Sequence, residues 1–170
     1  MSTKQQTDKP YREVSLGSRE IVVEQKGDVM YIRLKQELGP YPDRMTDRLD
    51  YWAEHAPDRT FIAKRVPAGG EWKRITYKEA RDTARRIGQA LAKRKLSADR
   101  PIAILSGNDL EHMMLQLGAQ YAGVPFSAIS PSYSLVSTDH AKLRHIFGLL
   151  TPGLVFAASG GIPSLRVAAT

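Results

Sequence analysis

The chain contains no cysteine, which excludes a disulfide scaffold, a thiolate metal site and a cysteine nucleophile. It also lacks a long hydrophobic run. The most apolar stretch near its end, residues 149–159, contains Pro152 and Gly153 and is far too short to cross a bilayer. Residues 1–15 are polar and hold no apolar segment of signal-peptide length. We therefore expect a soluble cytoplasmic protein that does not engage a membrane.

Several motifs of known chemistry are also missing. The sequence has neither G-x-G-x-x-G nor G-x-x-x-x-G-K-[ST]. Its histidines show no metal-binding spacing, so no metal site is predicted: they are His55, His112, His140 and His145. Ser106 lies in a strand-to-helix turn of the kind that hydrolases use, but no G-x-S-x-G surrounds it and nothing marks its acid and base partners.

The composition is that of an ordinary globular domain. The chain has 170 residues, of which 42% are hydrophobic and 25% charged, enough for one domain or one domain with an arm. Its 25 Lys and Arg exceed its 18 Asp and Glu, giving a net charge of +7. That excess permits an anionic partner without establishing one.

The first part of the chain predicts an arm, a hairpin and a helix. Residues 1–11 are polar and aperiodic. Two short strands within residues 20–36 flank a turn at Lys26, Gly27 and Asp28. After a connection rich in proline and glycine, a helix over about 46–56 is predicted to bury one face. That face consists of Met45, Leu49, Trp52 and Ala56.

Strands are predicted at 60–66 and 72–75, and the best-signalled helix follows. Thr76 and Glu79 have capping-box spacing. The helix then carries an apolar stripe formed by Ala80, Ala84, Ile87 and Leu91. On its other side lie Lys78, Arg81, Arg85 and Arg86. The simplest interpretation of these charges is a solvated surface, and the alternative is a face that holds an acidic partner or nucleic acid.

From residue 102 onward strands and helices alternate. Strands are predicted at 102–105, 126–129 and 154–158. One helix between them is capped by Asn108 with Glu111 and closed by Gly123, and the other covers about 137–150. This order predicts an α/β fold, a partial doubly wound parallel sheet with helices on both faces, preceded by a small β-hairpin region. Ligands of such sheets bind at the carboxyl ends of the strands, here residues 106–108 and 130–134.

The order of several segments resembles a known family. They are TYKEARDTARRIGQALA at 76–92, RPIAIL at 100–105, SGN at 106–108, QYAGVPF at 120–126 and SPSYS at 130–134. Together they resemble the N-terminal part of adenylate-forming acyl-CoA synthetases, the AMP-binding family. SPSYSLVS and KLRHIFGLLTPGLVFA look closest to feruloyl-CoA synthetase and related aryl-acid CoA ligases. The resemblance runs from about Tyr11 to Ser159.

The resemblance implies that ATP and Mg²⁺ activate a carboxylic acid as an acyl-adenylate, which then passes to CoA. The substrate it implies is a hydroxycinnamate-type aryl acid. The family's phosphate loop and catalytic lysine do not occur in this sequence, so no catalytic residue is assigned. We expect the chain to be inactive alone and to bind none of these cofactors tightly.

One possible site and three segments also follow from the resemblance. It would place Ser132, Tyr133 and Ser134 near CoA in a complete enzyme.

The expected division is an arm and hairpin at 1–44, a partial N-terminal α/β domain at 45–159 and an off-pattern tail at 160–170. Nucleic acid is not expected as a partner, and self-association is expected through the strand edge at 154–158. The alternative is a standalone small basic α/β module that binds an acidic partner or nucleic acid.

Overall fold

A computed structural model describes residues 17–18, 20–66 and 70–157. The chain divides after Tyr41 into two compact units, which are described separately. The arm expected at 1–11 and the tail expected at 160–170 lie outside the described residues. Among the helices in the described ranges, none is both long enough and apolar enough to span a membrane.

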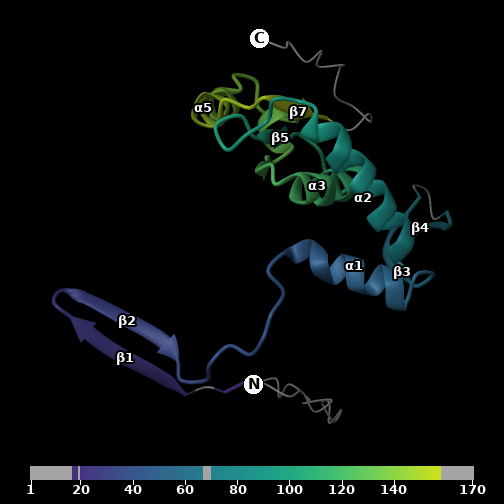
Figure 1. Ribbon diagram of the computed structural model, residues 1–170. Helices are drawn as coiled ribbons and strands as arrows, with labels where there is room; N and C mark the ends of the chain where they lie inside the picture. Colours follow the sequence, from purple (N-terminus) through teal and green to yellow (C-terminus); the bar gives the residue numbers. More distant parts are fainter. Residues whose placement is uncertain (1–16, 19, 67–69, 158–170) are drawn as a thin grey trace, which may run out of the picture. The chain divides into compact units, whose positions relative to one another are not determined.

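The first unit contains the predicted hairpin. Strands β1 (Ile21–Lys26) and β2 (Val29–Leu34) pair antiparallel, so that Lys26 faces Val29 across a two-residue loop (Figure 1). Gly27 has a φ of 61°, which fits a type II′ turn because this turn needs a positive φ at its first central residue. The hairpin prediction is confirmed.

In the second unit, helix α1 (Met45–His55) forms where expected but buries a different face. Thr46, Leu49 and Ala53 are buried, whereas Met45 is 80% exposed and Trp52 is 37% exposed. The predicted stripe through Met45, Leu49, Trp52 and Ala56 is therefore wrong at Met45 and Trp52, while Leu49 is buried and Ala56, at the helix end, is half-buried. The carboxylate of Asp50, on the flank of α1, binds side chains of two other helices and sets the rotation of α1.

An antiparallel pair, β3 (Thr60–Arg65) and β4 (Trp72–Thr76), leads into helix α2 (Tyr77–Ala92). The capping box is confirmed: Glu79 N–H donates to Thr76 Oγ1 at 3.2 Å, and Thr76 N–H donates to Glu79 Oε2 at 2.8 Å. The backbone bond lowers the pKa of the Glu79 carboxyl, and the bond from the Thr76 hydroxyl lowers it further. The buried stripe along α2 includes Ala80, Ala84 and Leu91.

The remaining elements build a parallel sheet. They are β5 (Ile102–Ile104), α3 (Leu110–Ala122), β6 (Phe126–Ala128), α4 (Ser132–Leu135), α5 (Ala141–Leu150) and β7 (Leu154–Phe156). The strand order is β6-β5-β7, and both pairs are parallel. The chain thus moves to one side of β5 through α3 and crosses to the other side through α5. Crossover connections between parallel strands are right-handed. Because these two connections run in opposite directions across the sheet, their helices α3 and α5 must cover opposite faces.

Alternating side chains of β5 show these two faces. Ile102 and Ile104 pack with residues of α2 and α3, including Leu91, Leu115 and Ala119. Ala103 and Leu105 pack on the other side with Leu143, Ile146 and Phe147 of α5. Each of the residues from Ile102 to Leu105 is at most 1% exposed. The partial doubly wound sheet with helices on both faces is confirmed.

The predicted start of α3 is displaced by one residue. The cap residue is Asp109, not Asn108, and its side chain makes no capping hydrogen bond. Its carboxylate instead pairs with Lys64 of β3, a long-range contact that local spacing does not reveal. Gly123, with a φ of 66°, closes α3 as predicted and donates its N–H to Ala119 and Gln120.

The last helix begins later than expected. The predicted element over about 137–150 is α5, which starts at Ala141. Before it, Ser137 Oγ accepts from the backbone N–H of His140 at 3.1 Å and bonds the Asp139 carboxylate at 2.9 Å, which holds the chain in a turn. A hydrogen bond from the Ala141 backbone N–H lowers the pKa of the Asp139 carboxyl, and the bond from the Ser137 hydroxyl lowers it further.

Candidate functional site

The carboxyl ends of β5 and β6 lie next to each other and lead to opposite faces of the sheet. Ile129 N–H donates to the Ile104 carbonyl at 2.9 Å, so the two strands stay paired up to this edge. Beyond it, residues 106–109 turn toward α3, while residues 130–131 turn toward α4 and α5. The two loops bound a crevice at the carboxyl edge of the sheet, which is the edge at which doubly wound folds bind ligands.

His112, from the first turn of α3, is buried at this edge and has polar contacts on both ring nitrogens. Its Nδ1 lies 2.9 Å from the Gly107 carbonyl oxygen and 3.1 Å from Ser106 Oγ. Its Nε2 lies 2.9 Å from Gln116 Nε2, one helical turn further along. Sequence spacing gave His112 no role, and only the fold brings Ser106 beside it.

These contacts fix the hydrogen bonding of the ring. The Gly107 carbonyl only accepts, so Nδ1 must carry the proton and donate it. In the neutral ring Nε2 is then the acceptor, and the Gln116 amide N–H donates to it. Nδ1 therefore has no lone pair with which to take a proton from Ser106. Because the other ring nitrogen faces an amide rather than a carboxylate, the group does not form a Ser-His-Asp arrangement.

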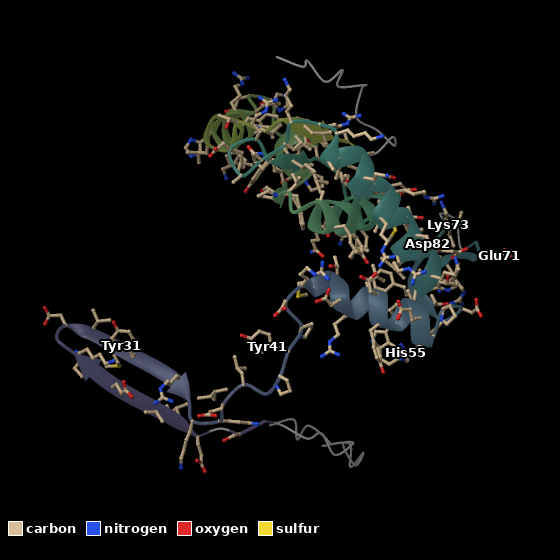
Figure 2. The ribbon with its side chains drawn as sticks, in the orientation of Figure 1. Tyr31, Tyr41, His55, Glu71, Lys73 and Asp82 are labelled. Atoms are coloured by element: carbon tan, nitrogen blue, oxygen red, sulfur yellow. The ribbon has the colours of Figure 1, made fainter. Side chains whose placement is uncertain are left out.

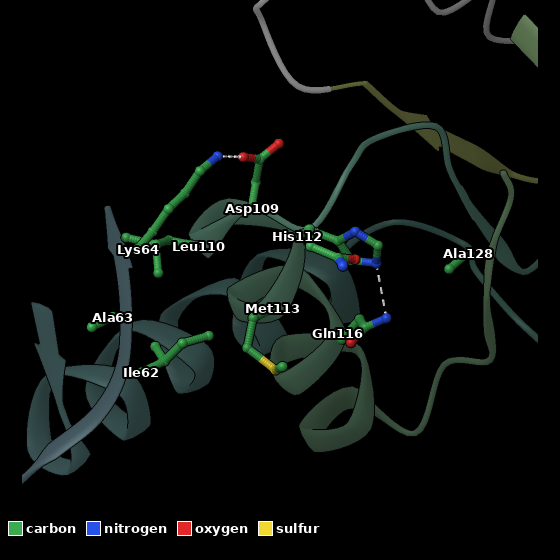
Figure 3. Close-up of a pocket in the computed structure, with 10 residues that line it drawn as sticks. Ile62, Ala63, Lys64, Asp109, Leu110, His112, Met113, Gln116 and Ala128 are labelled. Carbon is green, nitrogen blue, oxygen red and sulfur yellow. Dashed lines mark hydrogen bonds and ion pairs between the residues drawn. The ribbon is translucent and has the colours of Figure 1, made fainter. Parts of the chain in front are cut away.

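A cavity of about 380 Å³ opens beside His112 (Figure 3). Its lining comes from β3, the first turns of α3 and the end of β6: Ile62, Ala63, Lys64, Asn108, Asp109, Leu110, His112, Met113, Gln116 and Ala128. Apolar walls with a few polar groups and a volume above about 300 Å³ are typical of small-molecule sites. The cavity lies at the sheet edge where the topology predicts one.

The cations around this cavity are already paired. Lys64 contacts the Asp109 carboxylate within it. Nearby, Lys73 Nζ of β4 lies 3.8 Å from Glu111 Oε1, and Figure 2 labels Lys73 close to Glu71, which precedes this strand. These contacts tie the hairpin β3–β4 to the start of α3. An added anion would have to compete with Asp109 for Lys64, so this ion pair does not by itself constitute an anion site.

Ser132, Tyr133 and Ser134 lie together on α4, directly after the other strand of the crevice. Ser132 is exposed, and its hydroxyl lies 2.9 Å from that of Ser130. Ser134 donates to the Pro131 carbonyl at 3.1 Å. The Tyr133 ring packs under the sheet and has Lys142 Nζ 5.4 Å from its centre. None of the three lines the 380 Å³ cavity.

The basic residues of α2 are mostly neutralised within the protein. Lys78 lies 2.6 Å and Arg81 3.1 Å from the Asp82 carboxylate, and Asp82 is labelled on α2 in Figure 2. Arg85 binds Asp50 at 2.8 Å, and Arg86 donates to the Thr83 hydroxyl at 3.2 Å. These contacts weaken the interpretation of this face as a site for an acidic partner.

A polar cluster that the sequence did not reveal joins α1, α2 and α3. The Tyr121 hydroxyl donates to Asp50 Oδ1 at 2.6 Å, and the same oxygen accepts from Arg85. The Arg85 guanidinium also lies 5.7 Å from the centre of the Tyr121 ring. Burial raises the pKa of Tyr121, and the bond to Asp50 raises it further, so the phenol stays protonated.

Within the described ranges, no group of three or more His, Asp or Glu side chains is placed to hold a metal ion. The cavity and the crevice therefore contain apolar walls, hydroxyls, amides and paired charges, and they lack a resident cluster of carboxylates.

Fold and crevice together define a doubly wound α/β protein with a ligand edge at β5 and β6. Residues 49–167 match the model of the AMP-binding enzyme family. The chain therefore belongs to the AMP-binding enzyme family. The matched range includes part of the tail expected at 160–170. A comparison with curated proteins found no match.

Solved structures with this fold include adenylate-forming proteins. The fatty acid AMP ligase from Legionella pneumophila has a TM-score of 0.59 and 19% identity, with 68% of this chain and 20% of that chain covered. CmiS6 has a TM-score of 0.59 and 20% identity, covering 79% and 33%. An artificially fused adenylation–PCP di-domain NRPS from Klebsiella oxytoca has a TM-score of 0.54 and 14% identity, covering 69% and 22%. The chain thus spans a fifth to a third of these proteins, and at such identities the likeness concerns the fold.

Proposed function

We propose that this chain supplies the N-terminal part of an ATP-dependent acid–CoA ligase, with residues 45–159 as its partial α/β domain and residues 160–170 as a tail outside it. The supporting observation is the crevice at the carboxyl ends of β5 and β6, found in a chain that belongs to the AMP-binding family. The protein acts in the cytoplasm. Its substrate is a hydroxycinnamate-type aryl acid, a proposal that rests on the resemblance of SPSYSLVS and KLRHIFGLLTPGLVFA to aryl-acid CoA ligases.

ATP with Mg²⁺ would activate the carboxylate, and CoA would accept the acyl group. The described residues contribute one wall of the crevice to this chemistry. Ser132 is the member of the Ser132–Ser134 group that faces solvent, so its hydroxyl is the one we place nearest to CoA. Tyr133 supports that turn by packing under the sheet. We propose no activity for these residues alone, because the family's phosphate loop and catalytic lysine do not occur in this sequence.

Unsatisfied apolar surface supports the proposal that further protein packs here. Strands β6 and β7 form the two edges of the described sheet. Leu149 of α5 is 71% exposed, and no residue of α5 is buried. Its side chains that pack on the sheet, Leu143, Ile146 and Phe147, are half-buried. Additional strands and helices from the same ligase would cover these surfaces.

Pyrophosphate release tests the proposal. The 170-residue chain is incubated with ATP, Mg²⁺ and ferulate. A second sample contains a longer protein, in which residues 1–159 are followed by the sequence that the downstream DNA encodes. We expect no release above the no-protein control for the chain and clear release for the extended protein. Palmitate in place of ferulate separates an aryl-acid ligase from a fatty-acid ligase. Release by the chain itself contradicts the proposal.

A further inference from the structure

The hairpin β1–β2 has two chemically different faces. Directly opposed residues of an antiparallel pair project to the same side, and the register alternates between two sets. One set contains the pairs Ile21–Leu34, Val23–Ile32 and Gln25–Met30. We call this set the apolar face. Its one polar member, Gln25, turns its amide back to donate to the Gly27 carbonyl at 2.7 Å.

The opposite face is charged and internally satisfied. Glu24 lies 3.3 Å from Arg33 and 3.6 Å from Lys26. The Lys26 ammonium is also 5.1 Å from the centre of the Tyr31 ring. Val22 and Glu24 are half-buried, and Lys26 is exposed. A network of surface ion pairs of this kind is compatible with contact with water.

Within the described residues of this unit, the apolar face stays more than half exposed. Its five apolar side chains, Ile21, Val23, Met30, Ile32 and Leu34, are between 52% and 64% exposed. A two-stranded hairpin by itself is at best marginally stable in water and becomes stable when an apolar face is packed. We therefore expect another surface to pack on this face.

We propose that the apolar face of one chain packs on the apolar face of a second copy. The face contains no charge, and its central pair, Val23 and Ile32, is flanked by Ile21–Leu34 on one side and Gln25–Met30 on the other. A twofold axis through that centre therefore sets apolar side chains against apolar side chains and leaves both Gln25 amides at the rim. The two hairpins form a small sandwich with the charged faces outward.

The area agrees with a dimer of moderate affinity. Five apolar side chains that are more than half exposed present about 500 Å² per copy, so a pair buries about 1,000 Å², the lower bound of a specific interface. Such a dimer closes on itself.

Sedimentation equilibrium of the full 170-residue chain tests the proposal, with Ile32→Lys on the apolar face and Val29→Lys on the charged face as a matched control. Val29 is 54% exposed on the same strand, so general damage to the hairpin affects both variants. We expect a reversible dimer, weakened at least about tenfold by Ile32→Lys, because a buried unpaired charge opposes association, and nearly unchanged by Val29→Lys. A monomeric wild type at about 100 μM overturns the proposal, since interfaces of this size hold at such concentrations.

Cross-linking locates the contact, because the chain has no cysteine of its own. Val23→Cys places one thiol per chain beside the twofold axis, and Tyr31→Cys places one on the charged face. Packed sheets lie about 10 Å apart, beyond disulfide reach, so a short bis-maleimide is the reagent. We expect rapid cross-linking of Val23→Cys and slow cross-linking of Tyr31→Cys. Equal rates, or a monomer whose Val23→Cys thiol is protected from maleimide, would show another cover and refute the dimer.

Discussion

The contact between α2 and α3 depends on Gly118, and its replacement gives a quantitative prediction. A Cβ added at Gly118 would lie 2.4 Å from Ile87 Cγ2 and 2.7 Å from Ile87 Cβ. Carbon atoms in contact are normally about 3.5–4.0 Å apart, so the added methyl overlaps by more than 1 Å. Ile87 is β-branched and stiff at χ1, and its Cβ moves only with the backbone. Helix α2 must therefore shift to admit the methyl group.

We expect Gly118→Ala to lower the free energy of unfolding by about 2 kcal/mol. This value lies within the range for methyl groups added to packed cores, and it already includes the gain in helix propensity from glycine to alanine. For a domain of this size that corresponds to about 4–8 °C in Tm. Gly148 of α5 is the control, because its Cβ would meet nothing within 4 Å. Gly148→Ala is expected to raise stability by about 0.5–1 kcal/mol.

Urea unfolding followed by circular dichroism measures both variants, and Gly88→Ala adds an intermediate case. Its Cβ would lie 3.0 Å from the Gly118 carbonyl oxygen and 3.1 Å from Tyr121 Cβ. The predicted order of midpoints is Gly148→Ala above wild type, then Gly88→Ala, then Gly118→Ala. A Gly118→Ala variant as stable as wild type would mean that α2 and α3 do not approach this closely.

Three further predictions follow from the ion pairs and exposed surfaces. Tyr121→Phe removes a hydrogen bond to the Asp50 carboxylate and should lower the free energy of unfolding by about 1.5–3 kcal/mol. Because folding raises the pKa of Tyr121, the stability of the wild type should fall as the pH rises above about 10. Urea unfolding measured over this pH range should show a smaller loss in the variant, which has no phenol to titrate. Binding of the 170-residue chain to random duplex DNA should disappear by about 0.2 M salt, since Lys78, Arg81 and Arg85 of α2 already contact carboxylates. Sequence-selective binding that survives would revive the basic-module alternative. The chain should also bind a hydrophobic dye and unfold at low denaturant; a sharp, reversible transition without dye binding would argue against an incomplete sheet.

Elements set by local signals could be predicted from the sequence. The Thr76–Glu79 capping box, the Gly27 turn and the Gly123 helix end each depend on residues within one turn of chain. The alternation of strands and helices after residue 102 likewise carries the topology, because parallel strands need crossovers.

Features set by distant contacts could not be predicted in the same way. The rotation of α1 depends on Asp50 meeting Tyr121, 71 residues away, and the displaced cap of α3 depends on Lys64, 45 residues before Asp109. The pairing of Ser106 with His112 spans only six residues, but it requires the turn at the end of β5 to fold back over α3. Side-chain spacing carries no signal for such geometry.

We propose that the chain works as one part of a larger adenylate-forming ligase. The mass of the native protein in its source cells tests this most directly, measured by denaturing electrophoresis with an antibody raised against residues 45–157 and by mass spectrometry of the captured band. We predict a protein several times heavier than 18.9 kDa that contains peptides of this chain. A native protein of 18.9 kDa would contradict the claim.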